Sequence, residues 1–367
     1  MKILHIGKYY PLNGGMETVI SDIVRHFSGK GHQCDMLCVA TKEPGIYTIN
    51  ENCKIISVPA YCNVAKTALS SQMITTLRKI ANNYDVIHIH CPNPIGNVAL
   101  LLANFKGKVI VHWHSDIIKQ KHLLRLYEPL QNLMLKKANI IIGTSDAYLE
   151  GSPCLRNVIE KTHSCPIGVT QVEPKENDVQ CIKSRYNNRK IILSVGRLTE
   201  YKGHKYLIEA AKYLNDEYII LIAGIGPLQT QLEKQIISEK LQNKVILLGK
   251  LSDTELHNHY GACDVFCLSS IWKSEAFGVV QIEAMSCGKP VVATNIVGSG
   301  VPWVNKHGYS GLNVPPMDSV AIANAIKEIT TDESLYRGYS QNALLRYQKL
   351  FTKEKMLARC EEIYNVL

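Results

Sequence analysis

Residues 190–228 read KIILSVGRLTEYKGHKYLIEAAKYLNDEYIILIAGIGPL, and their pattern predicts the class of fold. Two apolar runs rich in Ile and Leu, 190–195 and 218–223, have the length and composition of buried parallel strands. The segment between them, which starts at residue 204, is long enough for one helix. Two parallel strands that are joined by a single helix form a βαβ unit, so the stretch predicts a parallel α/β sheet.

The same alternation of short apolar runs with longer, helix-like segments extends along the chain in both directions. Further strands are expected at 244–248, 264–268 and 290–294, and a separate series at 2–7, 34–39, 54–58, 85–90, 108–113 and 139–143. Residues 16–28 carry a helical apolar stripe directly after the first strand. Two such series predict two doubly wound, Rossmann-like domains, and 367 residues exceed the roughly 250–300 that one core supports.

The expected domain boundary lies near residues 166–188. Residues 166–180, PIGVTQVEPKENDVQ, are polar, contain two prolines and show no clear period. We therefore expect one domain over 1–168 and a second over 169–350. The apolar residues of segment 351–367 have helical spacing, so we expect a terminal helix that docks back across the cleft between the domains.

The net charge of +9 is uneven, because residues 1–168 carry an excess of seven basic residues and the remainder an excess of two. A basic first half attracts phosphates, anionic lipids or nucleic acid, but ordinary solubility charge explains it equally well. The first residues do not read as a secretory signal. The twelve cysteines form no Cys-x-x-Cys pair, and the pairs Cys34/Cys38 and Cys263/Cys267 lie in strand-like runs. Buried free thiols in a reducing cytoplasm are therefore expected.

Glycines and basic residues gather where strands end. Asn13-Gly14-Gly15 precedes the first helix, and such glycines let backbone amides approach a phosphate, although a plain turn explains them as well. Arg197 and Lys202 follow the strand 190–195. Because open α/β sheets bind ligands at the carboxyl ends of their strands, this pair suits a diphosphate. Gly226, in Gly224-Ile225-Gly226-Pro227, marks a ligand loop or a simple turn before a helix at 227–240.

Two carboxylates flank a further helix start. Glu275 lies before the helix and Glu283 within it, with Phe277, Gly278 and Val279 between them. Glu275 could accept hydrogen bonds from sugar hydroxyls and Glu283 from ribose hydroxyls, while the free amides at the helix start favour a phosphate.

His112 and His114 follow one another at the end of the strand 108–113. On a strand both side chains point the same way, but no third ligand is evident in the sequence, so we expect no metal there. The chain also contains no Asp-x-Asp, which argues against a carboxylate-bound Mg²⁺ or Mn²⁺.

Taken together, these motifs resemble the retaining GT-B-fold glycosyltransferases of the family four type, which assemble bacterial lipopolysaccharide, O-antigen and capsule. The resemblance covers nearly the whole chain. It is carried by GGMETVI at 14–20, HWHSDIIKQ at 112–120, SVGRLTEYKGHKYLIEA at 194–210, AGIGPL at 223–228 and the E-x₇-E stretch SEAFGVVQIEAMSCGKPVVAT at 274–294.

The resemblance implies a role for each matching residue. Arg197 and Lys202 grip the donor diphosphate, Glu275 faces the donor sugar, and Glu283 binds the ribose. The amides of Phe277, Gly278 and Val279 lie beside the sugar, and Gly14 and Gly15 lie near the phosphates. His114 lies near the sugar and its leaving group, with His112 as the second choice.

The resemblance also implies the reaction. A hexose or N-acetylhexosamine leaves a UDP-sugar or GDP-mannose with retention of configuration, and no cofactor or metal is needed beyond this donor substrate. Some positions depart from the pattern: Ile167, Thr170, Ala276 and the run VGSGVPWV at 297–304 replace residues usual in the family. These departures leave the identity of the sugar open.

The alternative within this architecture is a nucleotide-sugar 2-epimerase, which needs no acceptor. A periplasmic-type binding protein and a nicotinamide dehydrogenase fit less well, because we expect no signal peptide and because no G-x-G-x-x-G follows the first strand. A glycan or lipid-linked oligosaccharide acceptor is expected, and nucleic acid is not. Residues 117–137, with Lys119, Lys121, Arg125, Lys136 and Lys137, read either as an interfacial helix on the inner face of the cytoplasmic membrane or as a domain helix with a solvated basic face.

Overall fold

The computed structural model describes residues 1–11, 14–64, 67–117 and 121–367. The described chain divides into two compact units. Unit 1 comprises Met1–Ile167 and Met356–Leu367, and unit 2 comprises Gly168–Lys355. Asn13 and Lys119 lie outside the described residues. In the described chain, no helix has both the length and the apolar character needed to cross a bilayer.

Unit 1 is built on an eight-stranded sheet in the order β10-β9-β8-β7-β1-β2-β4-β3. All neighbouring strands are parallel except β3, which pairs antiparallel with β4 at the edge. A separate hairpin pairs β5 with β6. The strands of unit 1 are β1 (Lys2–Tyr10), β2 (Gln33–Ala40), β3 (Gly45–Asn50), β4 (Cys53–Val58), β5 (Cys62–Val64), β6 (Thr67–Leu69), β7 (Val86–Cys91), β8 (Lys108–Trp113), β9 (Ile140–Gly143) and β10 (Thr162–Ser164).

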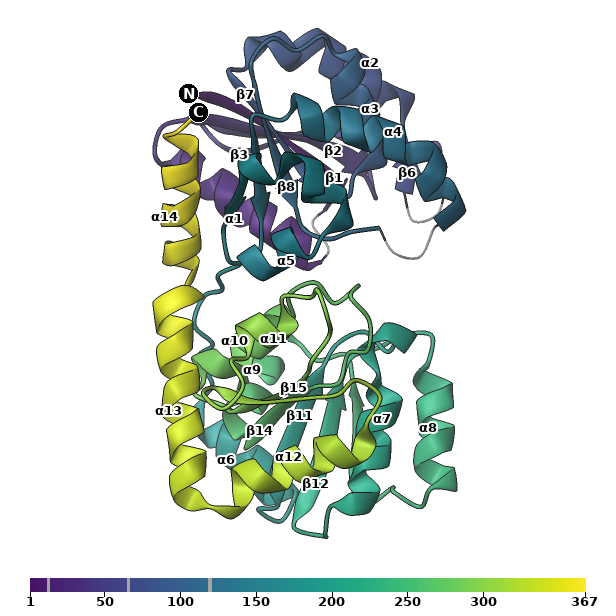
Figure 1. The fold of residues 1–367 in the computed structure, drawn as a ribbon, viewed down its shortest axis with the longest axis vertical. Helices are drawn as coiled ribbons and strands as arrows, with labels where there is room; N and C mark the ends of the chain where they lie inside the picture. Colours follow the sequence, from purple (N-terminus) through teal and green to yellow (C-terminus); the bar gives the residue numbers. More distant parts are fainter. Residues whose placement is uncertain (12–13, 65–66, 118–120) are drawn as a thin grey trace. The chain divides into compact units, whose positions relative to one another are not determined.

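Along the chain, most helices of unit 1 connect one strand to the next (Figure 1). They are α1 (Gly15–Gly29), α2 (Ser71–Ile80), α3 (Pro94–Leu102), α4 (Lys121–Lys137) and α5 (Asp146–Glu150), and the end of α14 (Lys353–Tyr364) joins them. In α14, Glu361 accepts hydrogen bonds from His26 and Lys30 in and after α1, and Cys165 Sγ lies 3.5 Å from Cys360 Sγ. The terminal helix therefore completes unit 1.

Unit 2 is built on a six-stranded parallel sheet in the order β13-β12-β11-β14-β15-β16. Its strands are β11 (Lys190–Val195), β12 (Tyr218–Ala223), β13 (Val245–Gly249), β14 (Val265–Leu268), β15 (Val291–Thr294) and β16 (Gly311–Val314). Its helices are α6 (Glu176–Arg185), α7 (His204–Ala210), α8 (Gln229–Ser238), α9 (Asp253–Ala262), α10 (Val279–Ser286), α11 (Val301–Val304), α12 (Ser319–Thr331) and α13 (Glu333–Leu350).

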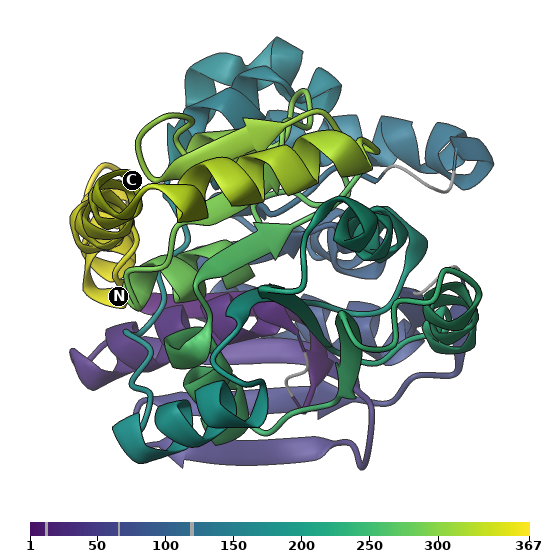
Figure 2. The same cartoon turned by 90° about the horizontal axis from the view of Figure 1, so that it is seen from below.

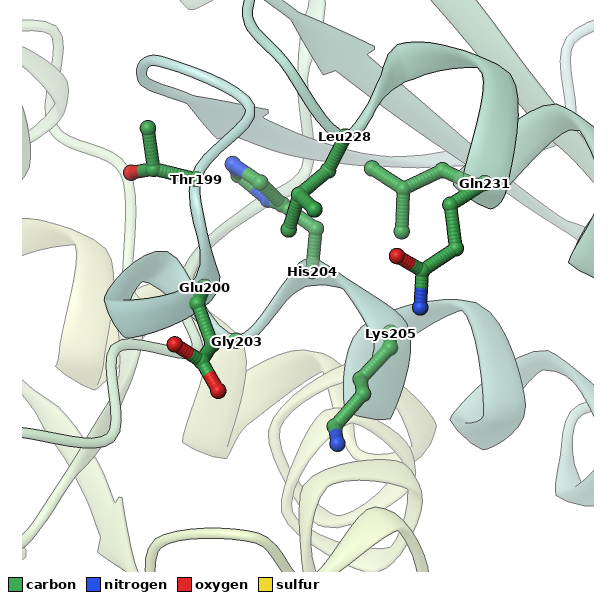
Figure 3. A pocket seen from close by; sticks show the side chains of 8 residues that line it. Thr199, Glu200, Gly203, His204, Lys205, Leu228 and Gln231 are labelled. Carbon is green, nitrogen blue, oxygen red and sulfur yellow. The ribbon is translucent and has the colours of Figure 1, made fainter.

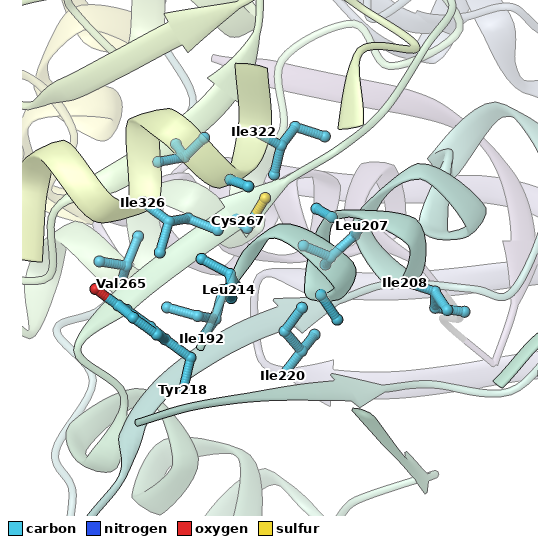
Figure 4. Close-up of a cluster of buried hydrophobic side chains, with 14 of the residues drawn as sticks. Ile192, Leu207, Ile208, Leu214, Tyr218, Ile220, Val265, Cys267, Ile322 and Ile326 are labelled. Atoms are coloured by element: carbon cyan, nitrogen blue, oxygen red, sulfur yellow. The ribbon is translucent and has the colours of Figure 1, made fainter. Parts of the chain in front are cut away.

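A buried apolar cluster lies between the unit 2 sheet and its helices. Figure 4 shows Ile192, Ile220 and Val265 of the strands facing Ile322 and Ile326 of α12. Helix α12 packs along β14, β15 and β16, and Figure 2 shows it crossing one face of the sheet. This packing fixes the inner strands β11 and β14, so the loops that follow them have a rigid base.

The structure differs from the predicted elements in three places. The region 166–188 contains helix α6, which buries only Val179 and Ile182, so its apolar face is too narrow to produce a clear period. Helix α8 begins at Gln229 after the N-cap Leu228, so Pro227 lies outside its first turn, and the helix ends at Ser238. The strands β3, β5, β6, β10 and β16 were not predicted, because they are short or lie at sheet edges.

Candidate active site

A buried ion pair joins the loops that follow β11 and β14. These strands are neighbours in the sheet, so the residues after their carboxyl ends meet at one edge. Lys202 Nζ lies 2.5 Å from Glu275 Oε2, and the two side chains are only 10% and 11% exposed. Burial, the largest single effect, lowers the pKa of Lys202, but the Glu275 carboxylate and Tyr201 together outweigh it, so the pKa is raised overall. The ammonium therefore stays charged at this edge.

The backbone around Lys202 is fixed by close contacts that require glycine. Lys202 ends the short 3₁₀ helix Glu200–Lys202, and Gly203 follows with a φ of +65°. A Cβ on Gly203 would lie 2.1 Å from the carbonyl oxygen of Ser269, and a Cβ on Gly196 would lie 3.0 Å from Lys202 Cε. Ser269 Oγ also donates to the Lys202 carbonyl over 3.0 Å. The ammonium is thus held in one position.

Glu275 is held by two serines that the sequence did not single out. Ser270 Oγ donates to Glu275 Oε2 over 2.9 Å, and Ser299 Oγ donates to the Glu275 carbonyl oxygen over 2.5 Å. Because Ser270 is the second residue after β14, its place near a strand end was the one available signal. Ser299 has no sequence signal, since it lies 24 residues from Glu275.

Glu283 occupies the second turn of α10 and has its own partner. Tyr260 in α9 donates from its hydroxyl to Glu283 Oε2 over 2.5 Å. Burial raises the pKa of Glu283, while the Tyr260 hydrogen bond opposes this shift. Glu275 and Glu283 therefore sit in different surroundings, although they flank the same helix start. Tyr260 was missed because nothing in the sequence relates α9 to α10.

The start of α10 has no side-chain cap. Phe277 is buried, Gly278 is the N-cap with a φ of +72°, and Val279 is the first helical residue. Gly278 has no side chain to cap the helix. The amides at such a start carry partial positive charge, which favours a bound anion.

Arg197 and Gly226 lie on two loops that are joined through their backbones. Leu198 N donates to the Ile225 carbonyl over 3.1 Å, and a Cβ on Gly226 would lie 2.4 Å from the Leu198 carbonyl oxygen. Gly226 thus allows this close approach. The exposed Arg197 side chain follows β11 and opposes the raised pKa of Lys202 through its positive charge. Unit 2 therefore places Arg197, Lys202, Glu275 and the α10 start at one sheet edge.

The remaining expected site residues belong to unit 1. Helix α1 begins at Gly15, and its N-cap Gly14 has a φ of +129°. His114 follows β8 at the carboxyl edge of the unit 1 sheet, where it is 9% exposed.

His114 belongs to a cluster of five buried histidines from three adjacent strands. The members are His5, His88, His90, His112 and His114. His5 Nδ1 lies 3.0 Å from His90 Nε2, and His90 Nδ1 lies 3.0 Å from His114 Nε2. Burial lowers the pKa of His5 and of His114 to about 3 and lowers those of the other three rings strongly. All five rings are therefore neutral at pH 7.

The cluster changes one argument about metals. His90 brings a ring nitrogen within 4.8 Å of those of His112 and His114. The fold therefore supplies the third nitrogen that is not evident in the sequence. The rings nevertheless stack, with His112 and His114 only 5° from parallel and 4.2 Å apart. Each nitrogen lone pair lies in its ring plane, so parallel planes do not converge on an ion about 2 Å from each nitrogen. The stacked cluster does not fit a tetrahedral site as it stands.

A separate pocket of about 170 Å³ lies beside the loop that carries Lys202 (Figure 3). Its walls are Thr199, Glu200, Gly203, His204, Lys205, Leu228, Gln231 and Leu232. Arg197, Lys202 and Glu275 are not among the residues that line this pocket. We therefore do not assign the expected donor to this pocket.

Two family models match the chain in succession. The model described as Glycosyltransferase Family 4 matches residues 13–151, and the model described as Glycosyl transferases group 1 matches residues 178–346. Among the relatives, the O-antigen chain mannosyltransferase C of Escherichia coli is 29% identical over 371 residues, which cover 100% of this chain and 99% of the relative. D-rhamnosyltransferase WbpZ of Pseudomonas aeruginosa is 29% identical over 358 residues, or 96% and 92% of the two chains.

Solved structures agree on the fold. The HepE protein of Anabaena, crystallised with UDP, superposes with a TM-score of 0.80 at 22% identity and full coverage of both chains. A glycosyltransferase from Rickettsia africae superposes with a TM-score of 0.77 at 22% identity, covering 99% and 97%. The chain belongs to the GT-B glycosyltransferases, with a family 4 segment followed by a group 1 segment.

Proposed function

We propose that this glycosyltransferase transfers a hexose or N-acetylhexosamine, with retention, from a UDP-sugar or GDP-mannose to a glycan or lipid-linked oligosaccharide in O-antigen or related surface polysaccharide assembly. The buried Lys202–Glu275 pair beside the exposed Arg197 carries the proposal. These cations would stabilise the charge that develops on the leaving diphosphate, which is the kind of preorganised electrostatics that often supplies the largest catalytic contribution. The names of the Escherichia coli and Pseudomonas relatives support the pathway.

The proposal is tested by a screen of UDP- and GDP-sugars with and without a lipid-linked oligosaccharide. Transfer should require the acceptor, and the anomeric configuration of the product should equal that of the donor by NMR. Conversion of the donor to its 2-epimer without an acceptor would support the epimerase alternative instead. Absence of both reactions with every donor would contradict the proposed function.

Turnover is expected to need no divalent metal. Arg197 and Lys202 would stabilise the negative charge of the leaving diphosphate, which a bound Mg²⁺ does in other enzymes. The chain also has no Asp-x-Asp that could hold such an ion. Steady-state transfer should therefore be the same in EDTA as in buffer. Loss of most activity in EDTA with recovery on adding Mn²⁺ would show that this expectation is wrong.

Glu275 and Glu283 should have separable roles. Glu283→Ala should weaken the bare nucleoside diphosphate and the whole donor together, because both contain ribose. Glu275→Ala should mainly lower kcat/KM, because its contact would be to the sugar as positive charge develops. Binding curves and kinetics for both variants measure the difference.

Tyr260→Phe is the matched control for Glu283. It removes the 2.5 Å hydrogen bond to Glu283 but keeps the carboxylate, so it should change nucleoside diphosphate affinity less than Glu283→Ala does. If Glu275→Ala loses nucleoside diphosphate as badly as Glu283→Ala, the motif acts as a single nucleotide clamp.

We also infer a peripheral contact with an anionic membrane through α4. Leu126, Leu130 and Leu133 are 79%, 37% and 54% exposed, and their spacing of four and three residues places them on one helix face. Arg125 and Lys136 on the same helix are also exposed. An apolar stripe beside basic side chains suits the surface of an anionic bilayer.

Sedimentation with vesicles tests the contact. Binding to anionic vesicles should exceed binding to neutral ones and should weaken with salt, because exposed charges are screened beyond about 8 Å at physiological ionic strength. Leu126→Ser with Leu133→Ser should reduce it, whereas Leu345→Ser, an exposed leucine of α13, should not. Equal binding to both vesicle types would contradict the contact.

A further inference from the structure

Three of the buried histidines form a continuous hydrogen-bonded chain. His5 in β1, His90 in β7 and His114 after β8 lie on three adjacent strands, with 3.0 Å between the bonded ring nitrogens at each step. His90 uses both of its ring nitrogens in this chain. The Nδ1 of His114 is therefore the ring nitrogen that remains for a ligand. His112 stacks on His114 but has no hydrogen-bond partner at either ring nitrogen among the described residues.

Counting protons fixes how the three rings depend on one another. A neutral imidazole has one N–H, so one of its nitrogens donates and the other accepts. His90 must then donate to one neighbour and accept from the other. If His90 donates from Nδ1 to His114 Nε2, His114 must carry its proton on Nδ1, and His5 must donate from Nδ1 to His90. The opposite direction reverses all three tautomers together.

The far end of the chain selects between the two directions. His5 Nε2 is buried and has no hydrogen-bond partner in the described part of the chain. In the first direction this atom is an unprotonated acceptor, and in the second it is an N–H. Buried backbone N–H groups without a partner are rarer than buried carbonyl oxygens without one, and we apply the same preference to the ring nitrogens. The first direction is therefore favoured, and it leaves His114 with an N–H at Nδ1.

We propose that His90 is a positioning residue that, through the chain His5–His90–His114, holds His114 in the tautomer that carries its proton on Nδ1. His114 then offers a hydrogen-bond donor and not a base. This rests on the proposed function for its catalytic meaning: in the reaction His114 would donate a hydrogen bond to a substrate oxygen, and it would not remove the proton of the acceptor hydroxyl.

The experiment determines histidine tautomers in the full-length protein. Two-bond ¹⁵N–¹H spectra of ¹⁵N-histidine protein distinguish the tautomers, and His114→Asn identifies the His114 signals among thirteen histidines. The wild type should show His114 with its proton on Nδ1. His90→Leu removes both bonds of the chain and should return His114 mainly to the Nε2–H form that histidine prefers in water. His90→Asn, whose amide can still donate near the Nδ1 position, should retain the wild-type tautomer.

Matched variants keep the result interpretable. His112→Phe preserves a stacked ring beside His114 and removes no bond of the chain, so the tautomer should not change. His5→Leu removes only the far end and should give a mixture of the two His114 forms, which provides the test if His90→Leu does not fold. A wild-type His114 with its proton on Nε2, or a tautomer that is unchanged in both leucine variants, would overturn the proposal.

Kinetics separate this proposal from the proposed function. His90→Leu should lower kcat for sugar transfer roughly tenfold while the affinity for the bare nucleoside diphosphate stays unchanged. His90→Asn should recover most of the loss. An altered tautomer with unchanged kcat would uphold the histidine chain and remove His114 from the proposed reaction. If no donor supports transfer at all, the proposed function fails while the spectra still decide the tautomer.

Discussion

Lys202→Ala is expected to weaken nucleoside diphosphate binding at least tenfold and also to destabilise unit 2. The lost charge-assisted contact with the diphosphate is worth about 1.5–3 kcal/mol. In addition, Glu275 would remain as a buried carboxylate without its 2.5 Å partner, and breaking such a pair typically costs about 3–5 kcal/mol. Titration calorimetry and thermal unfolding measure the two effects.

Two further variants separate binding from stability. Lys202→Ala combined with Glu275→Gln removes the buried carboxylate that Lys202→Ala alone leaves unpaired. The double variant should therefore recover much of the stability and none of the diphosphate affinity. Arg197→Ala removes an exposed cation, so it should weaken binding with little change in the unfolding temperature. Unchanged nucleoside diphosphate affinity in both Lys202→Ala and Arg197→Ala would show that these cations do not hold the donor.

The inner strands were predictable because each is a continuous apolar run. Strands β11 and β12 occupy the expected residues 190–195 and 218–223, since a strand buried on both faces requires apolar residues throughout. The two-domain GT-B architecture and the family are confirmed. Edge strands were not predictable in this way, because they are not continuous apolar runs. Strand β3 alternates between exposed and partly buried residues, and its antiparallel pairing depends on a turn and not on a helix.

The site was predictable only where a motif is local. Lys202 was predicted from its place after a strand, and the E-x₇-E pair from the family resemblance. The structure brings Lys202 and Glu275 into contact across a chain separation that no spacing rule covers. Tyr260 and Ser299 were missed because their partners lie 23 and 24 residues away. The histidine cluster needed the strand order β8-β7-β1, which places His114, His90 and His5 side by side. The roles of these residues stay predictions.

Acid is expected to unfold unit 1 steeply, because five of its histidines are buried in the neutral form. The pKa of His5 and of His114 falls from 6.5 to about 3 on folding, and those of His88, His90 and His112 also fall. The unfolded chain therefore binds more protons than the folded chain below pH 6.5. Their stabilising contribution is complete above that pH and is lost as the pH drops from 6.5 toward 3.

The size of the effect follows from the number of rings. Each ring contributes a slope that approaches roughly 1.4 kcal/mol per pH unit below pH 6.5, so five together approach about 7 kcal/mol per pH unit. Whole domains are stable by only about 5–15 kcal/mol, so unit 1 should unfold within roughly two pH units below 6.5. Calorimetry between pH 7.5 and pH 4.5, with hydrogen exchange on peptides from residues 1–167, locates and measures the loss.

One ring can be removed to test the cause. His112 has no hydrogen-bond partner at either nitrogen within the described residues, so His112→Leu deletes a protonatable group without breaking a bond. The variant should reduce the pH slope by about one proton and unfold at lower pH than the wild type. Thr144→Val, which removes a buried hydroxyl of the same unit that has no hydrogen-bond partner among the described residues and no titratable group, is the matched control and should leave the slope unchanged. Because both variants keep every carboxylate, ordinary acid titration of Asp and Glu cancels between them. Equal slopes in the two variants would mean that the buried histidines are not what makes unit 1 sensitive to acid.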